Sequence, residues 1–145
     1  MHTMTRQEWL DFIQTGTRTG KLGVTRAGGG PHVTPTWFLI DETPDGDVVV
    51  FTTNHTTVKA RALRRDPRFA ICVDDQAPPY SYVLIEAEAT LSEDLDALLT
   101  WATRLGDRYM GEDAAEEFGR RNAVPGELLV RGRITRVTAL AEITD

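Results

Sequence analysis

The sequence predicts a mainly β protein of the α+β class, in which about six antiparallel strands form a closed or nearly closed barrel flanked by helices. Three observations predict this fold class. Short β-branched and apolar runs follow one another with short, turn-rich connections. Strands and helices do not alternate regularly, and no G-x-G-x-x-G motif follows a strand, which argues against a parallel nucleotide-binding sheet. Barrel closure would also remove the free strand edges that promote aggregation.

The composition is that of one globular domain, which we expect to span residues 1–145. Hydrophobic residues make up 41% of the chain and charged residues 26%, so we expect a sizeable core rather than disorder. The net charge of −6 argues against nucleic acid or an anionic membrane as a general partner. The single cysteine, Cys72, lies in an apolar run and is expected in the core. No stretch approaches the ~20 apolar residues of a membrane span and the N-terminus has no apolar signal core, so a cytoplasmic location is expected.

The first half of the chain is expected to form one helix and a three-stranded meander. Thr5 and Glu8 have the spacing of a capping box, which predicts the start of the helix. Gly28–Gly30 and Thr43–Gly46 are typical of turns. Pro35 marks an edge or an irregularity, because proline cannot donate to a neighbouring strand. Strands are expected at residues 21–27, 32–41 and 48–53.

The second half is expected to add a short helix, two strands, two further helices and a final strand. The short helix covers about residues 57–65 and stops at Asp66–Pro67. The next helix is capped by Ser92 or Asp94, and the one after it covers about residues 113–121. Strands are expected at residues 69–74, 82–91 and 128–143, the last bent near Gly132. The first of the two later helices has a predicted apolar face of Leu95, Leu98, Leu99, Ala102 and Leu105.

The segment Thr53-Asn54-His55-Thr56-Thr57-Val58-Lys59 lies where the third strand ends and the short helix begins. The first amides of a helix have no partner within the helix, and the helix dipole adds partial positive charge there. The hydroxyls of Thr56 and Thr57, these amides and the Lys59 ammonium would together surround a phosphate, and Arg61 would extend the positive field. The alternative is that a threonine only caps the helix and that Lys59 is a solvated surface charge.

The string Thr53-Asn54-x-x-Thr57-x-Lys59-x-x-x-Leu63 resembles the phosphate-binding segment of the pyridoxamine-phosphate-oxidase-like split β-barrel flavoproteins. The likeness covers nearly the whole chain and is weakest between residues 94 and 121. Besides the glycine-rich turn, it includes the segments Pro31–Pro35, Trp37–Ile40 and Leu63–Arg68. This longer pattern is similar to the actinobacterial branch whose members use the deazaflavin coenzyme F420.

The resemblance implies a six-stranded split barrel of the FMN-binding type and a set of cofactor contacts. Thr53, Thr57 and Lys59 would hold the cofactor phosphate, with Asn54 and Thr56 in the same segment. Some relatives have an arginine at the position of Thr57, so fewer charges would face the phosphate here, and FMN is the alternative cofactor to F420. The residues expected against the tricyclic ring are Val33, Thr34, Pro35 and Trp37.

The implied activity is that of an oxidoreductase that uses F420 for hydride transfer to a small unsaturated or quinone-like acceptor. The alternatives are an FMN-dependent oxidase or reductase of the same fold, and a non-catalytic split barrel that binds a cofactor or haem. The reaction requires no protein nucleophile, and we assign no catalytic residue. The proton donor is left open among solvent and the side chains of Tyr80, Tyr82, Tyr109 and His32.

The resemblance also implies a homodimer with the cofactor at the subunit interface. Tyr80, Tyr82 or the last strand around Arg131 would then reach the cofactor from the second subunit. The three histidines show no metal-ligand spacing with the carboxylates, so no metal site is expected.

Two further groups of side chains have a predicted position but no assigned role. Trp101, Arg104 and Arg108 share one face of a predicted helix, either as a substrate wall or dimer contact or as ordinary packing with charged flanks. Glu86 and Glu88 alternate with alanines, which predicts that they lie on the outward side of a strand.

Overall fold

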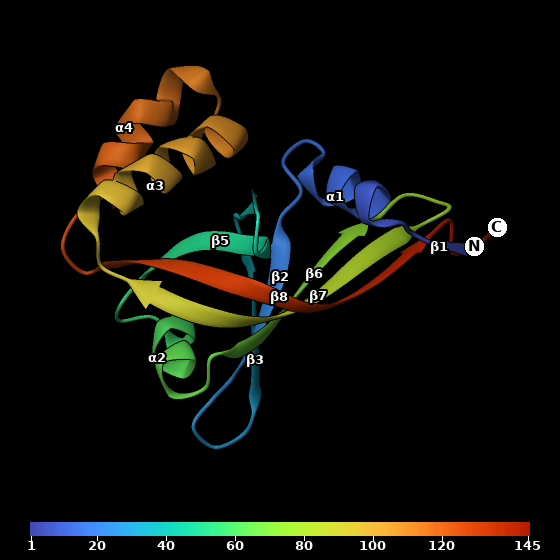
Figure 1. Ribbon diagram of the computed structural model, residues 1–145, viewed down its shortest axis with the longest axis horizontal. Coiled ribbons are helices and arrows are strands. Elements are labelled where there is room, and N and C mark those ends of the chain that lie inside the picture. Colours follow the sequence, from blue (N-terminus) through green and yellow to red (C-terminus); the bar gives the residue numbers. More distant parts are fainter.

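The computed structural model describes residues 1–145 and contains an open antiparallel sheet of eight strands with four helices (Figure 1). The strands are β1 (His2–Thr3), β2 (Gly20–Thr25), β3 (Pro31–Thr36), β4 (Leu39–Thr43), β5 (Gly46–Asn54), β6 (Arg68–Asp75), β7 (Ser81–Ser92) and β8 (Glu127–Ala141). Their order across the sheet is β3-β2-β6-β7-β8-β5-β4, and β1 pairs with β8. The mainly β, α+β fold class is therefore confirmed.

The sheet has eight strands rather than the predicted six, and it is open rather than closed. The predicted strand at residues 32–41 is interrupted at Trp37 and Phe38 and becomes the two strands β3 and β4. The pairing of β1 with β8 adds the other strand. β3 and β4 form the two ends of the sheet and do not pair with each other. Pro31 and Pro35 both lie on edge strand β3, where a missing donor is tolerated.

The four helices are α1 (Arg6–Gln14), α2 (Val58–Arg65), α3 (Leu95–Met110) and α4 (Glu112–Asn122). The capping box of Thr5 and Glu8 is present at the start of α1. Asp94 caps α3 by accepting a hydrogen bond from the amide of Asp96 at 2.9 Å. In Figure 1, α3 and α4 form an antiparallel pair at one corner of the molecule, while α1 lies above β7 and β8 and α2 below them. None of the four helices combines the length and the apolar composition that crossing a bilayer requires.

The main core lies between α1 and the inward-facing side chains of the curved sheet. Phe51 and Ile71 are among its largest fully buried side chains. A second, smaller cluster joins α3 to β5 and β8, and it consists of Val50, Leu98 and Leu129. The sheet is thus covered by helices on both faces, although by different helices at different ends.

Three side chains that were predicted in the core are not buried. Leu95 and Leu99 are 44% and 41% exposed, because the face of α3 that meets the sheet and α4 is narrower than predicted and is centred on Leu98. Cys72 is half-buried, because it alternates along β6 with the fully buried Ile71 and so points to the opposite face of the sheet.

β8 is the longest strand and is strongly curved in Figure 1. Its pairing with β7 shifts register between Glu86 and Ala87, which leaves Thr135 as the extra residue of a β-bulge. The irregularity therefore lies a little beyond Gly132, where the bend was predicted. Glu86 faces outward, as predicted, and its carboxylate lies 3.7 Å from Arg136.

α3 and α4 approach each other closely through two glycines. A Cβ at Gly119 would lie 3.2 Å from the Cα of Thr103, and a Cβ at Gly106 would lie 2.9 Å from the Cβ of Phe118. Both distances are shorter than ordinary van der Waals contact, so the two glycines set the spacing of the helices.

We expect Gly119→Ala to destabilise the protein by about 1–2 kcal/mol, because overpacking against Thr103 outweighs the gain in helix propensity. Urea unfolding followed by circular dichroism measures the change. Gly28→Ala is the control, since an added Cβ there meets nothing within 4 Å. A Gly119→Ala variant as stable as the wild type would contradict the close helix contact.

Candidate functional site

The turn between β5 and α2 is held in place by Asn54. The Asn54 Oδ1 accepts hydrogen bonds from the Thr56 amide at 3.0 Å and the Thr56 hydroxyl at 2.7 Å. The Asn54 Nδ2 donates to Glu127 Oε1 at 3.1 Å, and the His55 amide donates to the Gly126 carbonyl at 2.8 Å. The turn is therefore fixed to the start of β8.

The hydroxyls of Thr53 and Thr57 hold the same turn from the inside. Thr57 is the N-cap of α2, and its Oγ1 accepts from the Ala60 amide at 3.1 Å. Its one hydrogen goes to the Asn54 carbonyl at 3.0 Å. The buried Thr53 must therefore be the donor in its 2.8 Å contact with Thr57. The hydroxyl hydrogens of Thr53, Thr56 and Thr57 are all used within the turn.

Three donors at the start of α2 have no acceptor in the protein. The backbone amides of Val58 and Lys59, the first two residues of the helix, make no hydrogen bond. The Lys59 ammonium is half-buried, and burial lowers the pKa of Lys59 with no carboxylate to offset the effect. A partly desolvated cation and two free amides in the first turn of one helix favour the binding of an anion.

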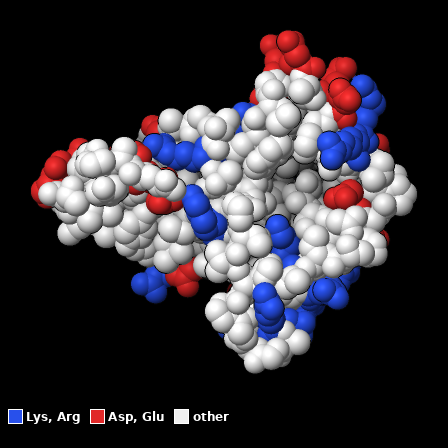
Figure 2. Space-filling view, turned by 180° about the vertical axis from the view of Figure 1, so that it is seen from behind, with Lys and Arg blue, Asp and Glu red and all other residues white.

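The surroundings of this site are basic, although the chain as a whole is acidic. Arg64 approaches Glu93 only at 3.9 Å, and Arg65 donates to the Thr25 carbonyl at 2.9 Å. In Figure 2, mainly Lys and Arg side chains appear over the lower part of the molecule, where α2 and the β2–β3 turn lie. α2 itself has no acidic residue and four basic ones, Lys59, Arg61, Arg64 and Arg65.

Strand β3 divides the predicted ring contacts between its two faces. Val33 and Pro35 pair with Gly23 and Lys21 on the outer face of the sheet, and Val33 is 63% exposed. Thr34 points to the other face, where its Oγ1 is buried without a hydrogen-bond partner. The alternation of a strand therefore prevents one flat face from carrying all of these side chains.

Trp37 lies in the break between β3 and β4, and its indole is held by α3 and α4. It stacks on Tyr109 with ring centroids 4.9 Å apart and an angle of 6° between the rings, and it packs on Phe118 at 5.2 Å. With Phe118 and Thr52, it lines a hollow of about 310 Å³. Because Thr52 precedes Thr53 on β5, this hollow is next to the β5–α2 turn along that strand.

Tyr109, which was considered as a proton donor, and Arg108, whose role was left open, hold this region together. The Tyr109 hydroxyl donates to the Arg18 carbonyl at 2.8 Å, and burial raises the pKa of Tyr109. Its proton is therefore engaged in the scaffold. Arg108 donates at 2.7, 3.0 and 2.8 Å to three backbone carbonyls, those of Ile13, Gly16 and Phe38. No local pattern predicts these contacts, since their partners lie far away in the sequence.

The other side chains considered as proton donors lie apart from the start of α2 or are engaged. Tyr82 on β7 lies opposite Asp74 on β6, near the end of β6 that is farthest from α2. Tyr80 immediately precedes β7 in the same region. The His32 Nδ1 lies 2.8 Å from a guanidinium nitrogen of Arg26. A contribution of Tyr80 or Tyr82 from a second subunit stays a prediction. No group of three or more His, Cys, Asp or Glu side chains is placed to hold a metal ion.

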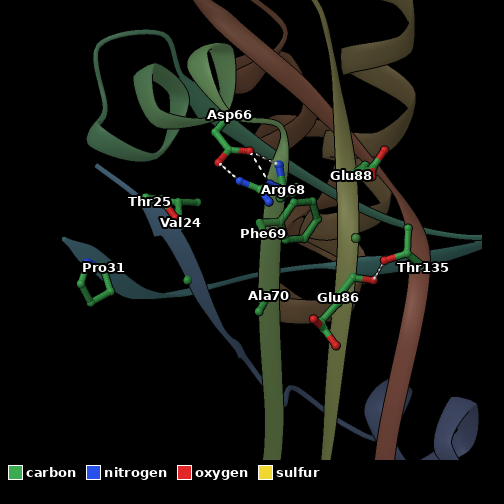
Figure 3. Close-up of a pocket in the computed structure, with 12 residues that line it drawn as sticks. Val24, Thr25, Pro31, Asp66, Arg68, Phe69, Ala70, Glu86, Glu88 and Thr135 are labelled. Carbon is green, nitrogen blue, oxygen red and sulfur yellow. Dashed lines mark hydrogen bonds and ion pairs between the residues drawn. The ribbon is translucent and has the colours of Figure 1, made fainter. Parts of the chain in front are cut away.

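The most voluminous of the main hollows, about 500 Å³, lies on the outer face of β2, β6 and β7 (Figure 3). Gly23 and Ala70 form its floor, and charged side chains including Glu88 form its rim. Arg68 binds both carboxylate oxygens of Asp66, at 3.0 and 2.8 Å, and lowers the pKa of Asp66 to about 2. None of the predicted cofactor-binding residues lines this hollow.

Solved structures share this fold. A conserved hypothetical protein from Mycobacterium tuberculosis has a TM-score of 0.81 and 25% identity, over 97% of this chain and 87% of that one. A protein described as an F420 reductase has a TM-score of 0.66 and 23% identity, over 88% and 94% of the two chains. The haem storage protein of Vibrio cholerae has a TM-score of 0.68 and 17% identity, over 92% and 94%. No curated protein matches the chain.

A family model matches almost the entire sequence. The model is described as pyridoxamine 5′-phosphate oxidase, and it matches residues 5–141. The match spans β3, the turn between β5 and α2, and β8, which together form the candidate site. The chain therefore belongs to the pyridoxamine 5′-phosphate oxidase family.

Proposed function

We propose that this protein is an oxidoreductase that binds a phosphate-bearing flavin-type cofactor, with F420 as the first candidate and FMN as the alternative. Its reaction would be hydride transfer to a small unsaturated or quinone-like acceptor. The observation that carries the proposal is the half-buried Lys59 ammonium, which has no counter-charge and belongs to the same first turn of α2 as two free amides. Family membership and the fold shared with an F420 reductase support it.

The chain's own groups would bind the cofactor phosphate at the start of α2. The amides of Val58 and Lys59 and the Lys59 ammonium would donate to phosphate oxygens. The other predicted residues of this segment, Thr53, Asn54, Thr56 and Thr57, would shape the turn that presents these donors. A threonine hydroxyl would donate to the phosphate only by leaving its present acceptor.

The ring would lie beside β3 and the Trp37 hollow. Trp37 is held rigidly by two aromatic neighbours and would offer a flat wall. The buried Thr34 hydroxyl, which has no partner, would donate to a ring heteroatom. Val33 and Pro35 would meet the cofactor from the outer side of the same strand. A bound flavin or deazaflavin supplies the hydride chemistry, and these residues orient it and exclude water.

A second copy of the chain would complete the site. The Trp37 hollow, about 310 Å³, is at the lower end of ligand pockets, which are on the order of 300–1,000 Å³. The exposed Val33 projects beside the small floor residues Gly23 and Ala70. A projection and a hollow on one face are self-complementary under two-fold symmetry, so we propose a homodimer through this face. Tyr80, Tyr82 or the last strand around Arg131 would then reach the cofactor from the partner.

We expect Lys59→Ala to weaken cofactor binding about 10- to 100-fold, because a charge-assisted hydrogen bond contributes about 1.5–3 kcal/mol. Titration of the intrinsic tryptophan fluorescence with F420 and with FMN measures the affinity. Arg61→Ala is the matched control, since Arg61 is exposed on the same helix and should change affinity less than about threefold.

Two further experiments, a turnover assay and a titration with haemin, distinguish the candidate functions. Oxidation of reduced F420 by enone or quinone acceptors distinguishes an enzyme from a binding protein. If the protein binds haemin tightly, binds it equally well in Lys59→Ala, and binds neither F420 nor FMN, it is instead a haem-binding split barrel. Cofactor affinity that is unchanged in Lys59→Ala refutes the proposed phosphate site.

We expect Lys59→Met to stabilise the cofactor-free protein at neutral pH, because it removes a half-buried charge without a partner. The folded-state pKa of Lys59 is lowered, so the unfolded chain binds the proton more strongly and wild-type stability rises as the pH increases through the folded pKa. The advantage of the variant should therefore shrink as the pH rises from neutral towards the ordinary lysine pKa of 10.5. Thermal unfolding across this range measures it, and a variant no more stable than the wild type at pH 7 would contradict the desolvation of Lys59.

We expect Ala70→Glu to raise the dissociation constant of the homodimer at least tenfold, because the new side chain fills the floor of the 500 Å³ hollow and adds a negative charge next to Glu86. Sedimentation velocity measures the dissociation, and circular dichroism checks the fold. Thr100→Glu, on the exposed side of α3, is the control. A wild type that stays monomeric at tens of micromolar would refute the dimer.

A further inference from the structure

A separate hollow of about 320 Å³ lies between β4, α3 and the end of α1. Its apolar floor includes Leu39 of β4, next to Ile40, whose side chain packs against the main core, and its wall is formed by Trp101, Arg104 and Arg108 of α3. None of the residues proposed to bind the cofactor lines it. The family relationship and the proposed redox function therefore leave this hollow unexplained.

The hollow has uncompensated positive charge. The Arg104 guanidinium makes no hydrogen bond or ion pair and lies 4.7 Å over the Trp101 ring. Arg108 is half-buried, and its donors go to backbone carbonyls rather than to a carboxylate. Asp41 is neutralised by Arg131 at 2.8 Å. Asp107 is the only other acid of the lining, so two guanidinium groups face one free carboxylate.

The geometry around Trp101 also suits a planar molecule. Its ring is half-buried and has a second guanidinium, that of Arg131, at 5.7 Å. An indole bordered by apolar side chains offers a stacking surface. The Arg104 guanidinium lies over that ring without a hydrogen-bond partner, so it can swing aside and present two parallel donors, which match a carboxylate. The apolar floor and the charged rim thus select one chemical class.

We propose that this hollow is a binding site for a small planar aromatic carboxylate. The ring takes the place of the Arg104 guanidinium over Trp101, next to Leu39, and its carboxylate accepts two hydrogen bonds from the displaced Arg104. Arg108 adds positive potential from below without donating, because its N–H groups are already engaged. The site is independent of the cofactor and of its phosphate.

2-Naphthoate is a suitable probe, with 2-naphthamide as its neutral analogue. Isothermal titration with the full chain should show that naphthoate binds at least tenfold more tightly than the amide. Arg104→Gln should weaken naphthoate at least tenfold and leave the amide unchanged. Arg120→Gln, exposed on α4 and paired only with Glu116, should change neither.

The position of the probe is tested by the indole N–H signals of the three tryptophans in a proton–nitrogen NMR spectrum. The signal that disappears in Trp101→Phe is that of Trp101, and naphthoate should shift it more than the other two. The proposal is overturned if Arg104→Gln binds naphthoate as tightly as the wild type, or if the shifts are confined to the other tryptophans. No binding at millimolar naphthoate would overturn it as well.

Discussion

The Lys59 ammonium is half-buried and has no carboxylate as a partner, so the surrounding structure must hold it in this position. An isolated helix as short as α2 would not be stable in water. It is held by Ala60, Ala62 and Leu63, which are at most 3% exposed. The position of Lys59 therefore follows from the way α2 packs on the core. A bound anion would offset the free-energy cost of burying this charge.

The turn before α2 shows that a hydroxyl side chain near a helix N-terminus is not always free to bind a ligand. Three threonines near a helix N-terminus suggest three donors to an anion. Each hydroxyl has one hydrogen, however, and the hydrogens of Thr53, Thr56 and Thr57 are used to cap the helix and close the turn. What the turn leaves free are the backbone amides of Val58 and Lys59, which any sequence would supply. The threonines are needed because they fix the direction in which these amides point.

Local signals predicted the parts of the fold that depend on neighbouring residues. The N-cap at Thr57, the capping box at Thr5 and the hairpin at Thr43–Gly46 all depend on contacts within four residues, and all are present. The split of the predicted strand at Trp37 was missed, because it depends on Tyr109, which stacks on Trp37 from a distant helix.

Burial was harder to predict than secondary structure. Leu99 satisfies the helical period of α3 but lies beyond the edge of the surface that the sheet and α4 cover. Cys72 lies in an apolar run, yet strand alternation turns it to the outer face. In the candidate site, the residues of the β5–α2 turn were predictable from spacing, whereas the Arg108 and Tyr109 contacts that build the Trp37 hollow depend on the tertiary fold.

The open edge of the sheet at β3 explains how one cofactor ring could contact all of the predicted residues of this strand. Val33 and Pro35 point outward from β3, and Thr34 points inward, so no single face of the strand presents all three. A planar group that touched them all would have to cross the free edge of β3. That edge is free because β3 and β4 do not pair, and Trp37 lies in the gap between them. The open edge of the sheet is thus what would give one planar group access to the side chains on both faces of β3.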